Sequence, residues 1–288
     1  MKIIPNYLRA LHKIKFEAIR RLHLLYYHLI KIRISRNRAP VSYQCNICGK
    51  PVSALLSEIC DRDMTSCHKC GASLRYRSII HILSKELFQD SKILTDFNEN
   101  KLLNGLGLSD WEGYAELLKK KFSYTNTYFH QEPFLDITVI PDSMIGAYDF
   151  LICSDVMEHI PPPVSIGFTN LYKLLKKGGL CVLTVPYMNY EKTWENFPEL
   201  YGYKIKHKGG RKYLENFTKS GEKEIFKEIN FHGGAGETLE MRIFSRSSLY
   251  DEMVMAGFKE IKFHRLHKPE FGIIWPINWS LIITARKT

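Results

Sequence analysis

Short apolar runs alternate with amphipathic helical patterns between residues 101 and 186, and this alternation constrains the fold more than any other feature of the chain. The strand-like runs are 101–110, which enters a glycine-containing turn, 122–129, 135–138, 148–153 and 180–185. Helical spacing of apolar residues fills 111–122 and 164–175. Such alternation is typical of a parallel sheet wound on both sides by helices. We therefore expect a doubly wound α/β domain.

Ligands of such sheets bind beyond the carboxyl ends of the strands. The candidate turns there are 104–110, 126–136, 153–159 and 186–195. In the first of them, Gly105 and Gly107 precede Ser109 and Asp110, either of which is placed to cap the next helix. A helix that begins there offers its first amide groups to an anionic ligand group.

Several stretches of this region resemble the class I S-adenosylmethionine-dependent methyltransferases. They are Asn104–Asp110, Asp136, Tyr148–His159 and Leu174–Pro186. The closest branch acts on small molecules and sugars, and its fourth strand ends in a V-x-E-H similar to Val156-Met-Glu-His159. A weaker match resumes at Ala256-Gly-Phe258, so that residues 258–264 and 278–287 would be the last two strands. The resemblance implies a Rossmann-like methyltransferase sheet with an antiparallel last strand.

The resemblance also implies a binding site for S-adenosylmethionine. The implied cofactor contacts are Gly105, Gly107, Ser109, Asp110, Tyr128, Asp136, Ser154 and Asp155. The two glycines would let the cofactor approach the backbone, and Asp136 would accept a hydrogen bond from the adenine amine. The alternative for Asp136 is a turn-forming aspartate. Ser154 and Asp155 would lie beside the methionine part of the cofactor.

Two positions depart from the family pattern. Ser109 stands where the turn usually has its third glycine. The acidic residue that usually ends the second strand and binds both ribose hydroxyls is missing, and Asn126, Thr127 and Tyr128 occupy that region. Either the ribose is held differently, or the cofactor affinity is reduced, or the chain is a descendant without activity.

Three histidines are candidates for a catalytic base or a substrate contact. His159 is the first, because it follows Glu158 at the exit of the fourth strand, and His130 and His232 come second. Methyl transfer requires an in-line nucleophile, and a base helps when the acceptor is a hydroxyl. The alternative for each is a structural or surface histidine.

Residues 187–240 form an insertion after the fifth strand, in which tyrosines and a tryptophan are interleaved with glutamates. This composition suits a sugar-like acceptor and equally suits an ordinary helical cap. The glycine-rich stretch 231–237 is expected to be a mobile loop over the site rather than a phosphate-binding loop.

Two CxxC pairs near the N-terminus, each followed by glycine, predict a structural zinc site. The expected ligands are Cys45, Cys48, Cys67 and Cys70, with 18 residues between the pairs. Cys60 and His68 lie nearby and could replace a ligand, but they lack the paired spacing. An odd total of seven cysteines argues against a secreted disulfide framework. We therefore expect reduced thiols and a cytoplasmic protein.

The positive charge of the chain is concentrated at its start. Residues 1–40 carry ten Lys or Arg and one acid, a net charge of +9, whereas the whole chain has +11. Apolar residues of this segment share one face of a predicted helix, namely Tyr7, Leu11, Ile14, Ala18, Leu22, Leu25 and Leu29. Such a helix could lie on an anionic membrane surface through residues 1–35, dock on protein, or bind nucleic acid. The nearly neutral remainder argues against nucleic acid.

The expected order of parts is therefore a basic amphipathic helix (1–40), a zinc-knuckle module (41–73), a connecting helix and linker (74–100) and the methyltransferase domain (101–288). The expected function is methyl transfer from S-adenosylmethionine to a small molecule or glycan precursor, and the inner membrane face is a candidate location. The alternatives are an RNA methyltransferase that uses the zinc module and basic start, and a binding protein that has lost the cofactor. The acceptor atom and the oligomeric state are not predicted.

Overall fold

The computed structural model describes residues 6–227, 229–232 and 238–288. The chain forms two compact units. Unit 1 comprises Met1–Asp96 together with Arg265–Asn278, and unit 2 comprises Phe97–His264 together with Trp279–Thr288. The last part of the chain therefore contributes one segment to unit 1 and then returns to unit 2.

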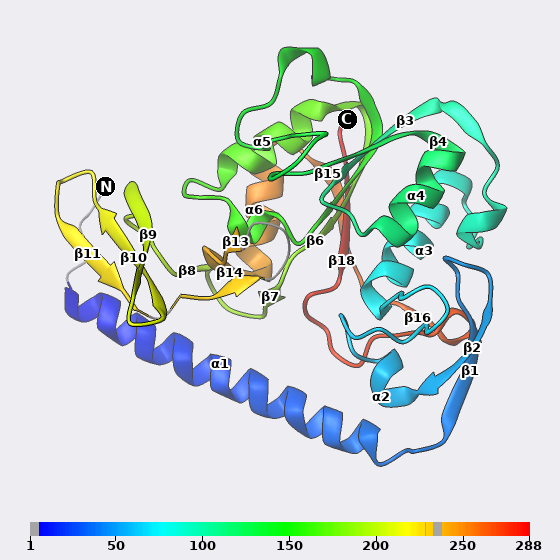
Figure 1. Cartoon of the computed structure of the whole chain (residues 1–288), viewed down its shortest axis with the longest axis horizontal. Helices are drawn as coiled ribbons and strands as arrows, with labels where there is room; N and C mark the ends of the chain where they lie inside the picture. Colours follow the sequence, from blue (N-terminus) through cyan, green and yellow to red (C-terminus); the bar gives the residue numbers. More distant parts are fainter. Residues whose placement is uncertain (1–5, 228, 233–237) are drawn as a thin grey trace. The chain divides into compact units, whose positions relative to one another are not determined.

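Unit 2 is built on a six-stranded sheet with the strand order β15-β18-β6-β5-β3-β4 (Figure 1). The strands are β3 (Asn100–Leu108), β4 (Phe122–Thr127), β5 (Tyr148–Ser154), β6 (Leu175–Thr184), β15 (Lys259–His264) and β18 (Ile282–Arg286). The pairs among β3, β4, β5 and β6 are parallel, whereas β18 runs antiparallel to both β6 and β15. The expected Rossmann-like methyltransferase sheet with its antiparallel last strand is confirmed.

Helices cover both faces of this sheet. Helix α4 (Glu112–Lys121) packs against β3 and β4, while α5 (Ser165–Leu174) and α6 (Arg246–Met255) pack against each other on the other side (Figure 1). The sheet between them is apolar on both faces, and Leu106, Phe150 and Ile152 have no exposed surface. This agrees with a parallel sheet that is covered on both sides.

Two local expectations for this unit were wrong. Residues 135–138 form a turn and not a strand end, and the nearby extended pairing is an isolated bridge between Tyr128 and Phe134. Neither Ser109 nor Asp110 caps α4, because the N-cap residue is Trp111, which makes no side-chain cap. The side chain of Asp110 instead points into the protein, where it accepts a hydrogen bond from Tyr124. Two short 3-10 helices, η2 (Asp142–Met144) and η3 (Met157–His159), complete the connections.

The insertion is a β-structure and not a helical cap in its described residues. Its strands are β7 (Tyr187–Met188), β8 (Trp194–Glu195), β9 (Gly202–Lys208), β10 (Arg211–Phe217), β11 (Lys223–Phe226), β12 (Phe231–His232) and β13 (Thr238–Leu239), followed by β14 (Arg242–Ser245). Strands β9, β10 and β11 form an antiparallel sheet. A small core of its own holds it together: Phe197, Leu200, Leu214, Leu239 and Met241. Most of the expected loop 231–237 lies outside the described residues.

Unit 1 surrounds the cysteine pairs. It consists of α1 (Asn6–Ser35), β1 (Pro40–Gln44), β2 (Pro51–Leu55), α2 (Leu56–Ile59), α3 (Leu74–Phe88), η1 (Leu94–Asp96), β16 (His267–Lys268), η4 (Pro269–Phe271) and β17 (Ile273–Ile274). Ser73 caps α3 by accepting from the Tyr76 amide, and Trp275 fixes the returning segment by donating from Nε1 to Ser78 Oγ at 3.0 Å. Among the described helices, none combines the length and apolar character that crossing a membrane requires.

Candidate functional site

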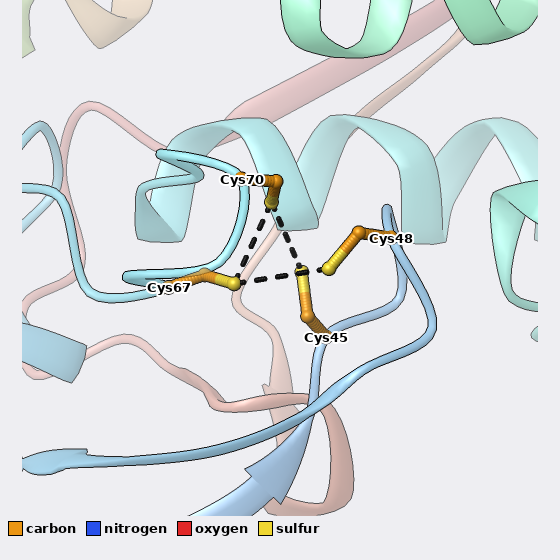
Figure 2. A group of neighbouring side chains, drawn as sticks. All are labelled: Cys45, Cys48, Cys67 and Cys70. Atoms are coloured by element: carbon orange, nitrogen blue, oxygen red, sulfur yellow. Dashed lines mark hydrogen bonds between the residues drawn. The ribbon is translucent and has the colours of Figure 1, made fainter.

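The structure brings the four paired cysteines together in unit 1. Cys45 and Cys48 lie on the turn between β1 and β2, and Cys67 and Cys70 lie on the turn before α3 (Figure 2). The sulfur–sulfur distances are 3.8 Å for Cys45–Cys70, 3.9 Å for Cys48–Cys67 and 3.5 Å for Cys67–Cys70. A tetrahedral zinc with Zn–S bonds of about 2.3 Å requires sulfurs about 3.8 Å apart. These three distances lie near that spacing, and all four sulfurs lie within 4.8 Å of one another, so the cluster could hold a zinc ion.

The backbone of each pair turns tightly enough to direct both sulfurs inward. The Gly49 amide donates to Cys45 O, and the Gly71 amide donates to Cys67 O, each at 2.8 Å. Hydrogen bonds from Cys45 and Cys70 lower the pKa of the Cys67 thiol, whereas the same shared hydrogen bonds raise the pKa of Cys45 and of Cys70. Thiolates are the form that binds metal. All four positions are protein ligands, which is the arrangement of a structural and not a catalytic zinc.

The two nearby alternatives do not join this cluster. Cys60 is buried, but its sulfur is not among the four that lie within 4.8 Å of one another. His68 is directed outward, with Nε2 3.9 Å from Glu58 Oε2 and more than half of its side chain exposed. Cys153 and Cys181 are buried in the sheet of unit 2, where burial raises the pKa of both thiols. These two are therefore unreactive core residues.

In unit 2, Gly105 and Gly107 were expected in a turn but lie within β3, just before the turn at 109–110, and neighbouring side chains fill the space beside them. A Cβ placed on Gly105 would come within 3.0 Å of the Phe150 and Tyr124 rings. A Cβ on Gly107 would likewise clash with Tyr124, Asp110 and Asn126 side chains. The sequence suggested that these glycines leave room for a cofactor; the structure shows that they leave room for side chains of β4, β5 and the turn. Ser109 adopts a left-handed conformation at φ 56°.

Asn126, one of the three residues in the region where the sequence resemblance implied a ribose-binding acid, holds this turn. Its Oδ1 accepts from the Asp110 amide at 2.9 Å, and its Nδ2 donates to Asp110 O at 2.9 Å and to Tyr128 Oη at 2.9 Å. The Ser109 amide donates to Thr127 O at 2.7 Å. Two backbone amides of the turn therefore bond to the protein. The sequence did not indicate this role for Asn126.

Two further side chains meet at the same turn. Tyr128 donates its hydroxyl hydrogen to Glu112 Oε1, so the start of α4 carries a carboxylate next to the end of β4. Burial raises the pKa of Glu112. Tyr124 is buried beneath them, and desolvation together with the Asp110 carboxylate raises its pKa well above its ordinary value. Tyr128 was expected at this edge, whereas Glu112 and Tyr124 were missed.

Asp136 lies in the turn after the bridge residue Phe134. Its Oδ1 accepts from the Thr138 amide at 2.8 Å and from Thr138 Oγ1 at 2.7 Å, as a turn-forming aspartate does. Both of these hydrogen bonds use the same oxygen. Oδ2 has no hydrogen-bond partner among the described residues and can therefore accept from a ligand donor such as an adenine amine.

The carboxyl ends of β5 and β6 are joined by a short polar chain. Ser154 Oγ lies 2.9 Å from Thr184 Oγ1, which donates to Asp155 Oδ1 at 3.0 Å. Asp155 is left-handed at φ 57°, a conformation that bulky residues avoid. The expected residues Ser154 and Asp155 therefore lie at the sheet edge predicted for them.

His159 follows on η3, with 13% of its side chain exposed. Its Nδ1 lies 3.0 Å from Leu239 O. A carbonyl can only accept, so Nδ1 carries the proton, and in the neutral ring Nε2 keeps its lone pair. Nε2 also lies 3.9 Å from a carboxylate oxygen of buried Glu158. The ring of His159 is therefore held by the insertion through Nδ1.

Arg242 fixes the segment that carries His159. It is fully buried, donates from Nη1 to Met157 O at 3.0 Å and to Ile160 O at 2.6 Å, and donates from Nε to Glu195 Oε1 at 2.8 Å. It therefore ties β14 and β8 to η3. No sequence pattern indicated this residue.

The other two histidines are not brought to this place by described contacts. His130 is exposed, and its ring lies edge-on to Phe129 with centroids 4.8 Å apart. His232 is the last residue of β12, and its side chain lies outside the described part of the structure. His159 is therefore the candidate with a geometry that supports base chemistry.

A cleft of about 350 Å³ opens between the insertion and the start of α6. It is lined by Val164, Glu191, Lys192, Thr193, Glu195, Phe244, Ser247, Ser248, Asp251 and Glu252. Burial raises the pKa of Glu252, although Arg242 acts in the opposite direction. The volume falls within the range of small-molecule sites. Hydroxyl and carboxylate groups dominate its lining.

No protein-family model matches this chain, and no curated protein matches it. Solved structures show similarity at low identity. The CurJ carbon methyltransferase is 12% identical over 75% of this chain and 56% of its own, with a TM-score of 0.45. An S-adenosylmethionine-bound aminopentose methyltransferase of Micromonospora echinaspora is 12% identical over 76% and 93%, with a TM-score of 0.42. A 1,6-didemethyltoxoflavin-N1-methyltransferase of Burkholderia thailandensis is 12% identical over 87% of this chain and 99% of its own, with a TM-score of 0.37. The fold assignment rests on the strand order of the sheet itself.

Proposed function

We propose that unit 2 transfers a methyl group from S-adenosylmethionine to a small-molecule or glycan-type acceptor. The observation that carries this proposal is the edge of the sheet after β5, where Ser154 and Asp155 precede His159, whose ring is oriented by the contact of Nδ1 with Leu239 O. When bound, the cofactor supplies an activated methyl group. His159 would take the proton that the acceptor hydroxyl or amine loses.

Asp136, Tyr128 and Glu112 are the residues that would hold the cofactor. Asp136 Oδ2 would accept from the adenine amine. The Tyr128 hydroxyl donates to the Glu112 carboxylate, so the pair offers acceptor oxygens to the hydroxyls of a ribose at this turn. We propose that this pair replaces the missing acid at the ribose.

Calorimetry with S-adenosylhomocysteine tests the cofactor site. Tyr128→Phe and Glu112→Gln should each weaken binding roughly 2- to 10-fold, because each removes one hydrogen bond or its charge. Glu99→Gln is the matched control, since Glu99 is an exposed acid just before the start of β3 and lies 3.9 Å from Lys101. Absence of binding by the wild-type chain would support the alternative of a binding protein that has lost the cofactor.

The cleft beside β8 is the proposed acceptor site. Thr193, Ser247 and Ser248 can exchange hydrogen bonds with hydroxyls, and the carboxylates suit hydroxyl or amine donors. A screen with labelled methyl donor against nucleotide sugars, lipid-linked sugars and RNA would identify the class. His159→Gln should lower kcat, and the acidic limb of its pH profile should be lost. His130→Gln is the control and should keep both. Methylation of RNA alone would overturn the small-molecule assignment.

We also propose that α1 binds an anionic membrane surface. Four apolar side chains of the predicted stripe remain 55–66% exposed, namely Ile14, Leu22, Leu25 and Leu29, and Ile32, which was not part of that stripe, is 40% exposed. The side chains of Tyr7 and Leu11 lie outside the described residues. The opposite face carries Lys31, whose Nζ pairs with Asp61 Oδ2 at 2.7 Å and attaches α1 to the rest of unit 1. The exposed stripe is thus turned away from that attachment.

Vesicle sedimentation tests this role. The full chain should bind vesicles with about 30% phosphatidylglycerol and release them at high salt, because basic residues add roughly 1 kcal/mol each near such a surface. Leu22→Ser with Leu25→Ser and Leu29→Ser should reduce binding at least roughly tenfold. Ser35→Ala is the control. The proposal would be overturned if the triple variant bound vesicles as well as the wild type. It would also be overturned if the chain bound only RNA, in a salt-dependent way.

A further inference from the structure

Arg77 is a fully buried cation in the middle of unit 1. It lies on α3 and has no exposed surface. Its Nη1 donates to Ala72 O at 3.0 Å and its Nη2 donates to Gly272 O at 3.0 Å. The guanidinium also stacks over the Tyr43 ring, 4.9 Å from its centroid. All of these partners are neutral.

No carboxylate of the described residues lies within 4.0 Å of this guanidinium. Removing an arginine from water without a counter-charge is strongly unfavourable, and arginine does not escape by losing its proton. Burial is the largest influence on the pKa of Arg77, and this burial lowers the pKa. A negative charge within the unit would therefore stabilise this buried cation beyond its two carbonyl acceptors.

The cysteine cluster is the place where such a charge would arise. Ala72 O, which accepts from Arg77, also accepts from the Cys67 amide at 3.0 Å. Asn46, between the first two cysteines, donates from Nδ2 to Arg77 O at 2.8 Å. The thiols of Cys45, Cys67 and Cys70 are among the groups that raise the pKa of Arg77. Arg77 is thus bonded to the turns of both cysteine pairs.

We infer that Arg77 is the buried counter-charge of a zinc–tetrathiolate centre and, through Gly272, fastens the segment 265–278 to it. Four thiolates and one Zn²⁺ carry a net charge of −2, and the guanidinium offsets half of it. Arg77 does not bind the metal; it is a positioning residue for the centre, as outer partners of metal ligands are elsewhere. The inference rests on zinc occupying the four cysteines.

Chelator competition on the full chain tests the charge. Arg77→Met should lower zinc affinity roughly 10- to 100-fold, and Arg77→Lys, which keeps the charge, should lose less. Arg75→Met is the matched control, because Arg75 lies on the same helix and pairs with Asp63 at 2.7 Å. Its affinity should stay within about twofold of the wild type. The inference would be overturned if Arg77→Lys bound zinc as weakly as Arg77→Met. It would also be overturned if Arg77→Met bound zinc as tightly as the wild type.

A second experiment separates charge from packing. Cys70→His replaces a thiolate by a neutral ligand, so the centre then carries a net charge of −1. The loss caused by Arg77→Met should be several-fold smaller in this background than in the wild type. An equal loss in both backgrounds would mean that Arg77 acts by packing and would overturn the inference. A wild-type chain without zinc would refute the zinc assignment itself.

Discussion

The cysteine cluster of unit 1 and the glycine turn of unit 2 both begin as short sequence motifs, but their polar groups end in opposite arrangements. The four sulfurs converge on one point at distances of 3.5–3.9 Å for the closest pairs. The turn amides of Ser109 and Asp110 are instead bonded to β4 residues. A ligand site requires groups that the fold leaves unpaired. The spacing of a motif therefore determines whether its side chains converge. Whether its polar groups remain available to a ligand depends on neighbours that are distant in sequence.

The strongest test of the cysteine side of this comparison removes two ligands. Cys45→Ser with Cys70→Ser should reduce bound zinc from one equivalent to none, measured by elemental analysis. Unit 1 should unfold, because zinc binding at such sites contributes on the order of 10 kcal/mol. Cys60→Ser is the control and should keep its zinc, since Cys60 lies outside the cluster. Full zinc content in the double variant would refute the ligand set.

The corresponding test of the glycine turn is Asn126→Ala. It leaves the buried Asp110 amide and carbonyl without their partner, at about 1–3 kcal/mol for each unsatisfied group. The urea midpoint of unit 2, followed by tryptophan fluorescence, should fall accordingly. Ser123→Ala, at an exposed position of the same strand, should leave it unchanged. A normal midpoint for Asn126→Ala would mean that the turn does not depend on this clamp.

Alkaline pH provides a further contrast beneath the turn. The pKa of Tyr124 is raised well above 10.0 in the folded chain. Above about pH 10 the unfolded chain therefore loses a proton that the folded chain keeps, and stability falls as pH rises. Tyr124→Phe should flatten this decline while costing about 1–3 kcal/mol at pH 7, because Asp110 loses its donor.

Tyr148→Phe is the control for the alkaline experiment. Tyr148 is only partly buried, and burial alone raises its pKa. Its substitution should change the decline less than Tyr124→Phe does. In unit 1 the pKa of Tyr43 is raised to about 12, so both units should weaken at high pH. If the stability of Tyr124→Phe still declines as steeply at alkaline pH, other groups of unit 2 cause the decline.

Some of this molecule could be predicted from local patterns. The alternation of apolar runs predicted the sheet, and the CxxC spacing predicted which sulfurs converge. The hairpin of β9 and β10 was missed although its signal is present: Gly209 and Gly210 form a two-residue turn with φ of 59° and 74°. Such a turn between two runs is a hairpin signal.

Other features had no local signal. The segment 265–278 belongs to unit 1 because Trp275 bonds to Ser78 and Gly272 to Arg77, pairs almost 200 residues apart in the chain. The Asn126 clamp and the Arg242 contacts likewise join residues from separate turns. Sequence alone shows which polar residues are present at a strand end. It does not show which of them are already paired.

Asp136 combines the two situations, because one of its carboxylate oxygens is bonded within the fold and the other, among the described residues, is not. Its substitution should have the smallest effect on stability. Asp136→Ala should cost about 0.5–1.5 kcal/mol, because Thr138 loses its acceptor. Asp136→Asn keeps an acceptor for the turn and should restore most of that stability. If Oδ2 also binds the adenine amine, Asp136→Ala should weaken S-adenosylhomocysteine binding roughly 2- to 10-fold in calorimetry. Unchanged affinity together with reduced stability would make Asp136 a turn residue alone, paired by the fold in the same way as Asp110.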